Sequence, residues 1–306
     1  MKKVLITGVN GQLGYDFVRQ LAYVNKINNV YYDQDKYIVY SPVRSEFDIT
    51  NKENVLSYCK KINPDFIIHC AAYTQVDQAE IDKDMAYLVN YEGTKNICEA
   101  AKACDSTVVF FSTDYVFDGL KNGEYSELDK PNPQSVYGMT KFLAEKEVAK
   151  LDKYIIARVS WLYGINGKNF VKTMLTLADK GVKEVNVVND QVGSPTYTKD
   201  VAYAVEKLMD RCDRTEDYGI YHVTNECAIS WAGFAKEIFS INDLDVNVNN
   251  ITTEEYNKNQ NKVIAPRPLN SRLSKSKLYE LGIDMPDWDN ALKRYNNELK
   301  KVLKRK

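Results

Sequence analysis

The segment Gly8-Val9-Asn10-Gly11-Gln12-Leu13-Gly14 places three glycines at even spacing between an apolar run and an amphipathic stretch. The apolar run, Lys3–Ile6, is typical of a buried strand, and Gln12–Val24 has the apolar spacing of a helix. In a strand–loop–helix turn, glycines let the backbone approach a pyrophosphate, which the helix N-terminus then faces. Three close glycines also occur in plain turns, but their position after a strand favours nucleotide binding. The segment therefore predicts a nucleotide-binding loop.

Short apolar runs and longer periodic segments keep alternating through the first half of the chain. Further strands are expected at Ile38–Tyr40, Phe66–Cys70, Val108–Ser112 and Tyr154–Arg158, and helices at Lys52–Ile62, Asp84–Cys104 and Val136–Leu151. Several strands are apolar at successive positions, as strands buried on both faces are. Thr50 followed by Glu53 predicts a capping box at the second helix. Repeated strand–helix units predict an α/β fold, a Rossmann-like doubly wound parallel sheet.

The pattern changes after about residue 160. Turn-rich segments lie at 163–168 and 189–198, and an asparagine-rich segment at 242–261. Helices are still expected at Asn169–Lys180, Lys199–Arg211, Ser230–Phe239 and Trp288–Lys304. We therefore expect residues 1–160 to form an NAD(P)-binding domain, to which part of 189–225 returns. Residues 161–306 should form mainly a smaller C-terminal substrate-binding lobe.

Composition excludes several classes of protein. The 306 residues carry 41 Lys+Arg against 42 Asp+Glu, a net charge of -1, which argues against a nucleic-acid or membrane-surface binder. Only two histidines, His69 and His222, leave little room for a His-rich metal site or a His-centred triad, so another residue type should carry acid–base chemistry. The N-terminal apolar run is too short for a signal peptide. Six cysteines without Cys-x-x-Cys spacing indicate reduced thiols in a cytoplasmic protein.

The residue that ends the second strand normally distinguishes NADH from NADPH. An acid there accepts hydrogen bonds from a ribose hydroxyl, whereas a nearby arginine accommodates a 2′-phosphate. After the expected strand the sequence reads Ser41–Arg44, with no acid before Glu46, which favours NADPH bound through Arg44. Asp33 or Asp35 would supply the acid if the strand lies earlier, so NADH is left as an alternative.

Tyr137 and Lys141 stand four residues apart on an expected helix and therefore share one face. A nearby ammonium favours a phenolate and lowers the phenol pKa from about 10 toward working pH. Thr113, at the end of the preceding strand, can hydrogen-bond a substrate oxygen. Such a trio would reduce a ketone, with a hydride from the nicotinamide, a proton from Tyr137, and Lys141 also holding the nicotinamide ribose. With 22 tyrosines in the chain, the spacing alone means little; its place downstream of the glycine loop gives it weight.

These motifs resemble the extended short-chain dehydrogenase/reductases, and among them the dTDP-4-dehydrorhamnose reductases. The segments that carry the resemblance are Gly8–Gly14, Ala71–Glu80, Ser112–Gly119, Tyr137–Lys141, Arg158–Gly164, Asn169–Met174, Asn189–Thr196 and Arg267–Leu273. They span almost the whole chain in order. The resemblance implies reduction of the 4-keto group of dTDP-4-dehydro-β-L-rhamnose to dTDP-β-L-rhamnose, a sugar donor for cell-surface polysaccharides.

The resemblance also implies roles for individual residues. Together with Arg44, the expected cofactor contacts are Gly8, Gly11, Gln12, Leu13, Gly14, Asp48, Ile49, Ala71, Ala72, Tyr73, Thr74, Phe111, Tyr137 and Lys141. The expected substrate contacts are Thr74, Val76, Thr113, Asp114 and Trp161. Tyr137 would donate the proton and Thr113 would tune it. Asn90 would support a proton-relay water, or would be an ordinary surface or capping residue.

Two family properties are left open. Members often use both NADH and NADPH through an acid after the second strand, which Ser41 and Arg44 replace here. Some members are Mg²⁺-dependent homodimers with interface glutamates that have no match we can identify, so we predict no metal and leave Mg²⁺ and a homodimer open.

Two other functions fit the same fold. A sugar-nucleotide epimerase or dehydratase would keep NAD⁺ tightly bound, and Thr113-Asp114 superficially resembles the acid pair of dehydratases. A non-enzymatic regulatory subunit is the third hypothesis, against which the intact Thr113, Tyr137 and Lys141 argue.

Several further residues have two interpretations. Arg267 or Arg272 would hold the substrate diphosphate, or Arg272 would form an ordinary ion pair. His69 ends an apolar strand and is expected to be a core residue. Asp77 and Glu80 are expected to stabilise a helix start rather than to act as a carboxylate pair.

Overall fold

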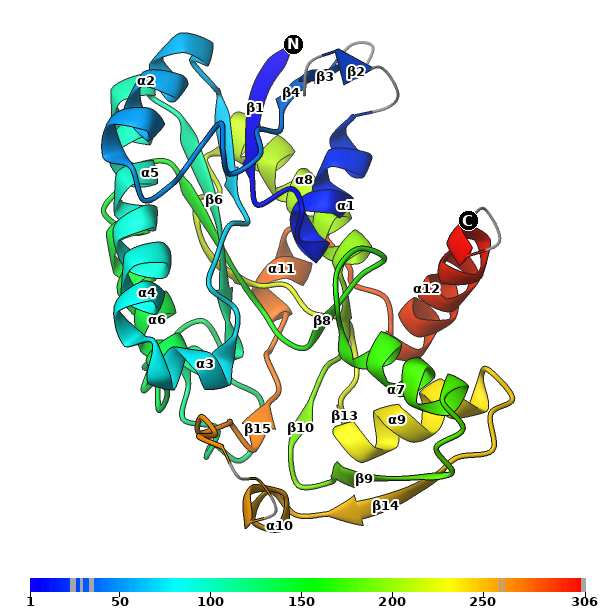
Figure 1. Ribbon diagram of the computed structural model, residues 1–306. Helices are drawn as coiled ribbons and strands as arrows, with labels where there is room; N and C mark the ends of the chain where they lie inside the picture. Colours follow the sequence, from blue (N-terminus) through cyan, green and yellow to red (C-terminus); the bar gives the residue numbers. More distant parts are fainter. Residues whose placement is uncertain (23–25, 28–29, 33–35, 259, 261, 304–306) are drawn as a thin grey trace.

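The computed structural model describes residues 1–22, 26–27, 30–32, 36–258, 260 and 262–303 (Figure 1). Its main sheet has, within these residues, the strand order β12-β7-β6-β5-β1-β4-β3-β2. The strands are β1 (Lys2–Thr7), β2 (Lys26–Ile27), β3 (Val30–Tyr32), β4 (Tyr37–Tyr40), β5 (Phe66–His69), β6 (Thr107–Thr113), β7 (Tyr154–Val159) and β12 (Gly219–His222). The run from β12 to β4 is parallel, and β3 and β2 add antiparallel strands at one edge. The predicted Rossmann-like α/β class is confirmed.

Helices cover both faces of this sheet (Figure 1). One face carries α1 (Gln12–Leu21) and α8 (Thr198–Thr215), and the other carries α2 (Lys52–Ile62), α5 (Gly93–Cys104) and α6 (Val136–Val148). The chain leaves β1 for β4 on one side and later returns to β5 on the other. The carboxyl ends of β1 and β5 therefore frame the switch point at which such sheets bind ligands.

The strand β1 shows why these elements form a buried parallel sheet. Successive side chains of a strand point to opposite faces. Val4 and Ile6 pack in the core under α1 and α8, whereas Leu5 packs in the core under α2 and α5. All three are fully buried, so the continuous apolar run predicted from sequence reflects burial on both faces.

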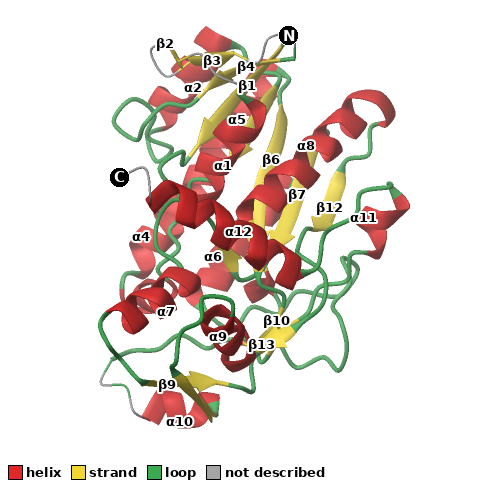
Figure 2. Cartoon of the chain, turned by 90° about the vertical axis from the view of Figure 1, so that its right-hand side faces the viewer, coloured by secondary structure: helices red, strands yellow, loops and turns green. Residues whose placement is uncertain are grey.

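A smaller lobe lies beyond the carboxyl ends of the strands (Figure 2). It contains the helices α7 (Phe170–Asp179), α9 (Trp231–Ser240), α10 (Thr253–Lys258) and α12 (Trp288–Leu303), whereas α11 (Ser276–Glu280) packs against β12 at the edge of the main sheet. Its short strand pairs join β8 (Leu162–Tyr163) to β11 (Thr196–Tyr197), β9 (Glu184–Val188) to β14 (Asn247–Ile251), and β10 (Val192–Gly193) to β13 (Ile229–Ser230) and β15 (Asn270–Ser271). Tyr163, Tyr197, Phe234 and Tyr295 stack at the centre of its core.

Several sequence predictions are wrong in detail. The expected helix Asp84–Cys104 is divided into α4 (Lys83–Tyr87), a turn of π-helix at Leu88–Glu92, and α5. Asn51 caps α2 through a bond from the Asn54 amide, instead of the predicted Thr50, because the Thr50 hydroxyl bonds Asp48.

The sequence analysis did not predict the strands β9 and β14, which pair with each other. Asparagine is unusual in strands, and β14 is rich in it. The predicted helix ends Val24 and Lys304, and the candidate acids Asp33 and Asp35, lie outside the described residues.

A buried ion pair fixes α6 against the sheet. Arg158 on β7 donates from Nε and Nη2 to the two carboxylate oxygens of Glu145 at 2.9 and 2.8 Å. Both side chains are almost fully buried. Glu145 follows Lys141 by one helical turn and Tyr137 by two, so the pair anchors the face of α6 that carries both candidate catalytic residues.

We expect Glu145→Gln to destabilise the protein by about 3–5 kcal/mol, because it leaves the Arg158 charge buried without its partner. Urea unfolding measures the loss. The double variant Arg158→Met/Glu145→Leu, which removes both charges, should recover most of it. A single variant with wild-type stability would contradict this role of the pair.

Candidate active site

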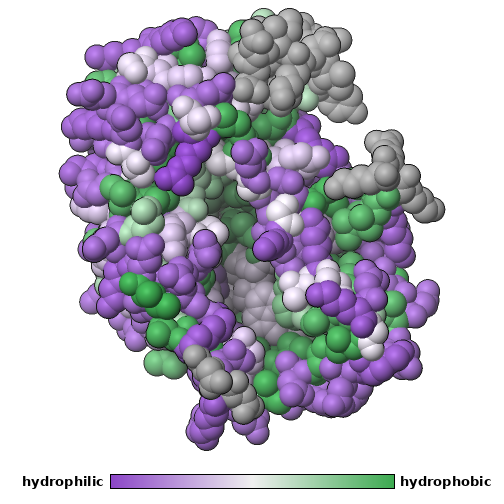
Figure 3. Space-filling model, in the orientation of Figure 1, coloured by the Kyte–Doolittle hydropathy of each residue, from purple (hydrophilic) through white to green (hydrophobic). Residues whose placement is uncertain are grey.

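Two adjoining pockets open between the sheet and the smaller lobe, where the space-filling view shows a hollow (Figure 3). The glycine-loop pocket, about 560 Å³, lies over the switch point between β1 and β5. The second-lobe pocket, about 670 Å³, lies beyond it against β8, α7 and α9. Thr74, Ser112 and Tyr137 line both, so the two compartments meet at the candidate catalytic residues.

The glycine-loop pocket has the backbone geometry that a dinucleotide requires. Gly8 has φ +67°, and a Cβ atom there would lie 2.6 Å from the Ala71 nitrogen. A Cβ on Gly14 would lie 2.5 Å from the Gly8 carbonyl oxygen. Gly11 begins α1 without a side-chain cap, which leaves the first amides of the helix available to an anion. The loop therefore fits a pyrophosphate.

Almost all of the expected cofactor residues meet in this pocket. It is lined by Gly8, Gly11, Gln12, Leu13, Gly14, Arg44, Asp48, Ile49, Ala71, Ala72, Thr74, Phe111, Tyr137 and Lys141. Tyr73 is the exception, because the walls of the pocket do not include it; its amide instead donates to the buried Asn90 side chain at 2.7 Å. Sequence reasoning gave no role to Asn10, Phe47 and Lys168, which also line the pocket.

The edge of this pocket carries Arg44 and no acid from the strand end. The strand β4 ends at Tyr40, as predicted, and Arg44 is exposed on the loop that follows. Partial burial opposes ionisation of Asp48, but hydrogen bonds from Thr50 and the nearby charge of Arg44 lower its pKa overall. The Asp48 carboxylate is thus already bonded within its own turn.

Tyr137 and Lys141 project from α6 toward the end of β6, where Thr113 is the last residue. Burial lowers the pKa of Lys141 to about 7, partly offset by Glu145, and its Nζ lies 4.0 Å from the centroid of the Phe110 ring. Burial, assisted by the charge of Asp114, raises the pKa of Tyr137 to about 12, while the Thr113 hydroxyl opposes the rise.

The prediction that a cation lowers the Tyr137 pKa toward working pH is therefore wrong for the protein without ligands. Desolvation of the phenol and the charge of Asp114 outweigh the Thr113 hydrogen bond, and burial disfavours the charge of Lys141 itself. The consequence suits a reduction, because a proton donor must start protonated.

The second-lobe pocket gathers all of the expected substrate residues, Thr74, Val76, Thr113, Asp114 and Trp161. Trp161 stacks on Trp231, with ring centroids 3.6 Å apart and planes 10° apart. A Cβ on Gly193 would lie 2.8 Å from the Trp161 ring, so the ring also packs closely against the Gly193 backbone. Trp231, Phe170 and Ser271 also line this pocket, and the sequence analysis gave them no role, although Ser271 lies within the Arg267–Leu273 motif.

Arg267, and not Arg272, lines the second-lobe pocket. Its Nη2 pairs with Asp77 at 2.8 Å, which joins the smaller lobe to the helix after β5. Arg272 bonds Asn270 instead, at 2.9 Å. Asp77 lies in the first turn of α3 (Val76–Ile81), as predicted, whereas the Glu80 carboxylate accepts from the Val136 amide at the start of α6.

His69 and Asn90 support the floor of the site from below. His69 is buried between the hydroxyls of Thr7 and Thr94, at 2.9 and 3.2 Å, and burial lowers its pKa to about 3. It is the core residue that the sequence predicted. Asn90 is buried, not a surface or capping residue, and its amide donates to the Tyr73 carbonyl and the Thr140 hydroxyl.

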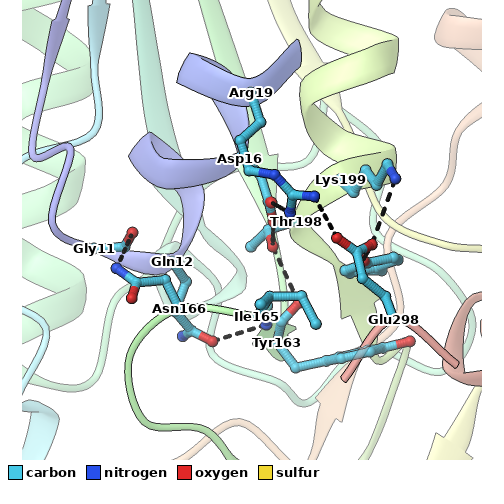
Figure 4. A network of polar contacts seen from close by, with 12 residues as sticks. Gly11, Gln12, Asp16, Arg19, Tyr163, Ile165, Asn166, Thr198, Lys199 and Glu298 are labelled. Atoms are coloured by element: carbon cyan, nitrogen blue, oxygen red, sulfur yellow. Dashed lines mark hydrogen bonds and ion pairs between the residues drawn. The ribbon is translucent and has the colours of Figure 1, made fainter. Parts of the chain in front are cut away.

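A polar network ties the glycine loop to the smaller lobe (Figure 4). The Asn166 amide donates to the Asn10 carbonyl oxygen at 2.8 Å. The Gln12 side chain accepts from the Gly164 amide at 2.9 Å and from Asn169 at 3.0 Å. The segment after β8 is therefore fastened directly over the loop.

The same network continues along α1. The buried Asp16 accepts from the Thr198 hydroxyl, which begins α8, and burial raises its pKa. Arg19 contacts both Asp16 and Glu298 of α12, and Lys199 pairs with Glu298 at 3.4 Å. In this part of the structure the acidic groups are thus already paired with cations or hydroxyls (Figure 4).

The described residues contain no group of three or more His, Cys, Asp or Glu side chains arranged to hold a metal ion. None of their helices has the length and apolarity needed to span a bilayer. The six cysteines are free, with Cys227 exposed.

The chain matches known proteins over nearly its whole length. The family model described as the RmlD substrate binding domain matches residues 1–301. A dTDP-4-dehydrorhamnose reductase of Aggregatibacter actinomycetemcomitans is 41% identical over 304 residues, which cover 96% of this chain and 98% of that protein. The chain belongs to the dTDP-4-dehydrorhamnose reductase family. The resemblance found in the sequence is confirmed.

Solved structures of dTDP-4-dehydrorhamnose reductases share the architecture. That of Bacillus anthracis, in complex with NADP, has a TM-score of 0.87 and 40% identity, covering 97% of this chain and 99% of that one. That of Clostridium acetobutylicum has a TM-score of 0.86 and 40% identity over the same shares. Because the alignments are nearly complete, the likeness to this reductase family extends over both the main sheet and the smaller lobe.

Lys141 should make stability depend on pH. Its pKa is about 7 in the fold and roughly 10.4 in an unfolded chain, so between these values the unfolded state binds more protons. The free energy of unfolding then rises with pH by up to about 1.4 kcal/mol per pH unit. We expect Lys141→Met to be more stable than wild type at pH 7, with a difference that shrinks toward pH 10 in urea unfolding.

The matched control is Lys146→Met, an exposed lysine of the same helix, which should show no such trend. A constant difference between Lys141→Met and wild type across this pH range would contradict the shifted lysine.

Proposed function

We propose that the protein reduces the 4-keto group of dTDP-4-dehydro-β-L-rhamnose with NADPH and forms dTDP-β-L-rhamnose. The observation that carries the proposal is Tyr137, which lines both pockets, so that its phenol faces the boundary between a dinucleotide and a second ligand. Family membership supports the substrate, since the relatives at 40–41% identity are named for this reaction.

The glycine-loop pocket is the proposed cofactor site. The Gly8 and Gly14 cradle would hold the pyrophosphate, and Arg44 would meet the 2′-phosphate of NADPH. NADPH, when bound there, supplies the hydride. The NADP complex of the Bacillus anthracis relative supports this choice of cofactor. Lys141 would hold the nicotinamide ribose from the floor of the pocket.

The chain's own residues supply the proton. Tyr137 would donate it to the substrate oxygen, and the raised pKa keeps the phenol protonated until then. The developing phenolate is favoured by the ammonium of Lys141 one turn along α6. Thr113 would hydrogen-bond the same oxygen, while Thr74, Val76, Asp114 and Trp161 surround the sugar nucleotide. Arg267, which lines this pocket, would bind its diphosphate.

We also propose that the cofactor and the substrate are bound by different parts of the chain. Residues 1–160 form the cofactor domain, and part of 189–225 returns to it, supported by the pairing of β12 with β7 and the packing of α8 on α1. Residues 161–306 form mainly the substrate lobe. Free cysteines suit a reducing cytoplasm. A homodimer and a role for Mg²⁺ are compatible with the family.

The direct experiment is coupled NADPH oxidation. The protein is mixed with dTDP-glucose, a glucose 4,6-dehydratase and the epimerase that follows it, and the product is identified. We expect NADPH loss that requires all three enzymes, and dTDP-β-L-rhamnose as the product. Purified protein that carries tightly bound NAD⁺ and consumes no NADPH would favour the epimerase or dehydratase function, and neither activity would favour a regulatory subunit.

Tyr137→Phe should reduce turnover by roughly 10²–10⁴-fold, because it removes the proton donor and leaves the pocket otherwise intact. NADPH affinity, measured by fluorescence quenching, should stay close to that of wild type. Near-wild-type turnover would remove Tyr137 from the mechanism.

Arg44→Ala should lower the preference of kcat/KM for NADPH over NADH by roughly tenfold or more, the loss expected for one charge-assisted phosphate contact. The control is Lys52→Ala, whose ammonium pairs with Glu99 outside the pocket. An unchanged preference in Arg44→Ala would mean that another group reads the 2′-phosphate.

A further inference from the structure

Asp114 is a buried carboxyl group beside the candidate catalytic threonine. It follows β6 directly, is 3% exposed, and lines the second-lobe pocket. The Ser271 hydroxyl donates to its Oδ2 atom, and Thr113 donates to its Oδ1 atom at 2.9 Å. Ser271 belongs to β15 of the smaller lobe, which reaches the lower edge of the sheet (Figure 1). A carboxyl group of one lobe is thus held by a hydroxyl of the other.

The hydrogen bonds of Thr113 conflict with its proposed role. A hydroxyl has one hydrogen and two acceptor positions. The Thr113 oxygen accepts from the Tyr115 amide at 3.3 Å. Its hydroxyl has two other partners, the Tyr137 phenol and Asp114 Oδ1 at 2.9 Å, and its one hydrogen is donated to the carboxylate. An ionised carboxylate can only accept. As long as Asp114 is ionised, Thr113 has no hydrogen left to donate to the carbonyl oxygen of a substrate.

We propose that Asp114 is a positioning residue that carries a proton in the productive complex and donates it in a hydrogen bond to Thr113, which turns the Thr113 hydrogen toward the substrate oxygen. Ser271 keeps its bond to the other carboxyl oxygen and fixes the orientation of the group. The inference rests on the proposed function and adds a condition to it: the threonine is an effective donor only while Asp114 is neutral.

The surroundings of Asp114 favour the neutral form. Burial raises its pKa to about 6, even though Ser271 and Thr113 both donate to the carboxylate. Tyr115 and, from α6, Tyr137 face it, and both phenols are neutral at this pH because their pKa values are raised. The other ionisable groups around the pocket are Lys168, Tyr256 and Arg267.

No ion pair joins Asp114 to a cation among the described side chains; Arg267 pairs with Asp77 instead. A bound sugar nucleotide would exclude water and bring negative charge, and both effects raise the pKa of Asp114 further.

The pH profile of kcat/KM tests the inference, because it reports ionisations of the free enzyme. In wild type, activity should fall as pH rises through the pKa of Asp114, near 6, and fall again as Lys141 loses its proton near 7. Above both values the decline approaches about a hundredfold per pH unit. In Asp114→Asn the amide donates to Thr113 at every pH. The decline of kcat/KM should therefore be about tenfold per pH unit and begin at a higher pH than in wild type.

Ser271→Ala provides a second, independent test. Losing this donor disfavours the carboxylate, so the Asp114 pKa rises and the first decline moves to higher pH. Ser274→Ala is the matched control, a half-buried serine of the same segment whose hydroxyl bonds Ser276. Its profile should match wild type. Thermal unfolding checks that each variant is folded. If Asp114→Asn does not fold, the pH profile of Ser271→Ala alone tests the role of Asp114.

The outcomes separate this inference from the proposed function. No NADPH oxidation by wild type at any pH contradicts the proposed function. Wild-type oxidation together with an unchanged slope in Asp114→Asn, a loss of its activity at every pH, or a Ser271→Ala profile that stays in place or moves to lower pH contradicts the role of Asp114.

Discussion

The close approach of two backbones at the switch point is the constraint on which the site depends. Gly8 lies so near the Cys70–Ala71 backbone that a side chain would have no room. This contact sets the end of β1 against the end of β5 and opens a pocket above both. The first turn of α1 then points at that pocket, and the bonds from Asn166 and Gly164 hold the smaller lobe over it.

Burial of ionisable groups provides the chemistry. The chain is nearly neutral as a whole, so attraction of an anionic substrate must be local. At the end of β6 the fold places Lys141, Tyr137 and Asp114 out of water, and each is shifted toward its uncharged form. The charge that these three groups keep depends on how well water solvates them, and a bound ligand changes that solvation. A site of this kind responds to its ligands without any histidine that titrates near neutral pH.

Much of this site could be predicted from the sequence, because its motifs stand at strand ends. Parallel strands bring their carboxyl ends together, so the glycine loop, Ala71–Thr74 and Thr113 had to meet once the sheet was predicted. The i, i+4 spacing then placed Lys141 beside Tyr137. These local rules gave the glycine loop and the trio of Thr113, Tyr137 and Lys141. The family resemblance added further cofactor contacts, and together they named about half of the residues that line the glycine-loop pocket.

What the sequence did not reveal depends on contacts between distant segments and on solvation. Ser271 meets Asp114 across 157 positions of the chain, and Trp231, at the start of α9, stacks on Trp161, between β7 and β8. The direction of the Tyr137 pKa shift was wrong, because helical spacing shows the cation but not the depth of burial. The strands β9 and β14 were hidden by their polar residues, since they lie in a pair at the surface rather than in the main sheet.

The central claim is that hydride reaches carbon 4 of the sugar while the chain supplies the proton. The most direct measurement uses NADPH deuterated at both C4 positions of the nicotinamide, with the product analysed by mass spectrometry and NMR. The account predicts one deuterium per product molecule, bound to carbon 4 of the rhamnose ring. Product without deuterium at that carbon, or with deuterium elsewhere in the ring, would contradict it.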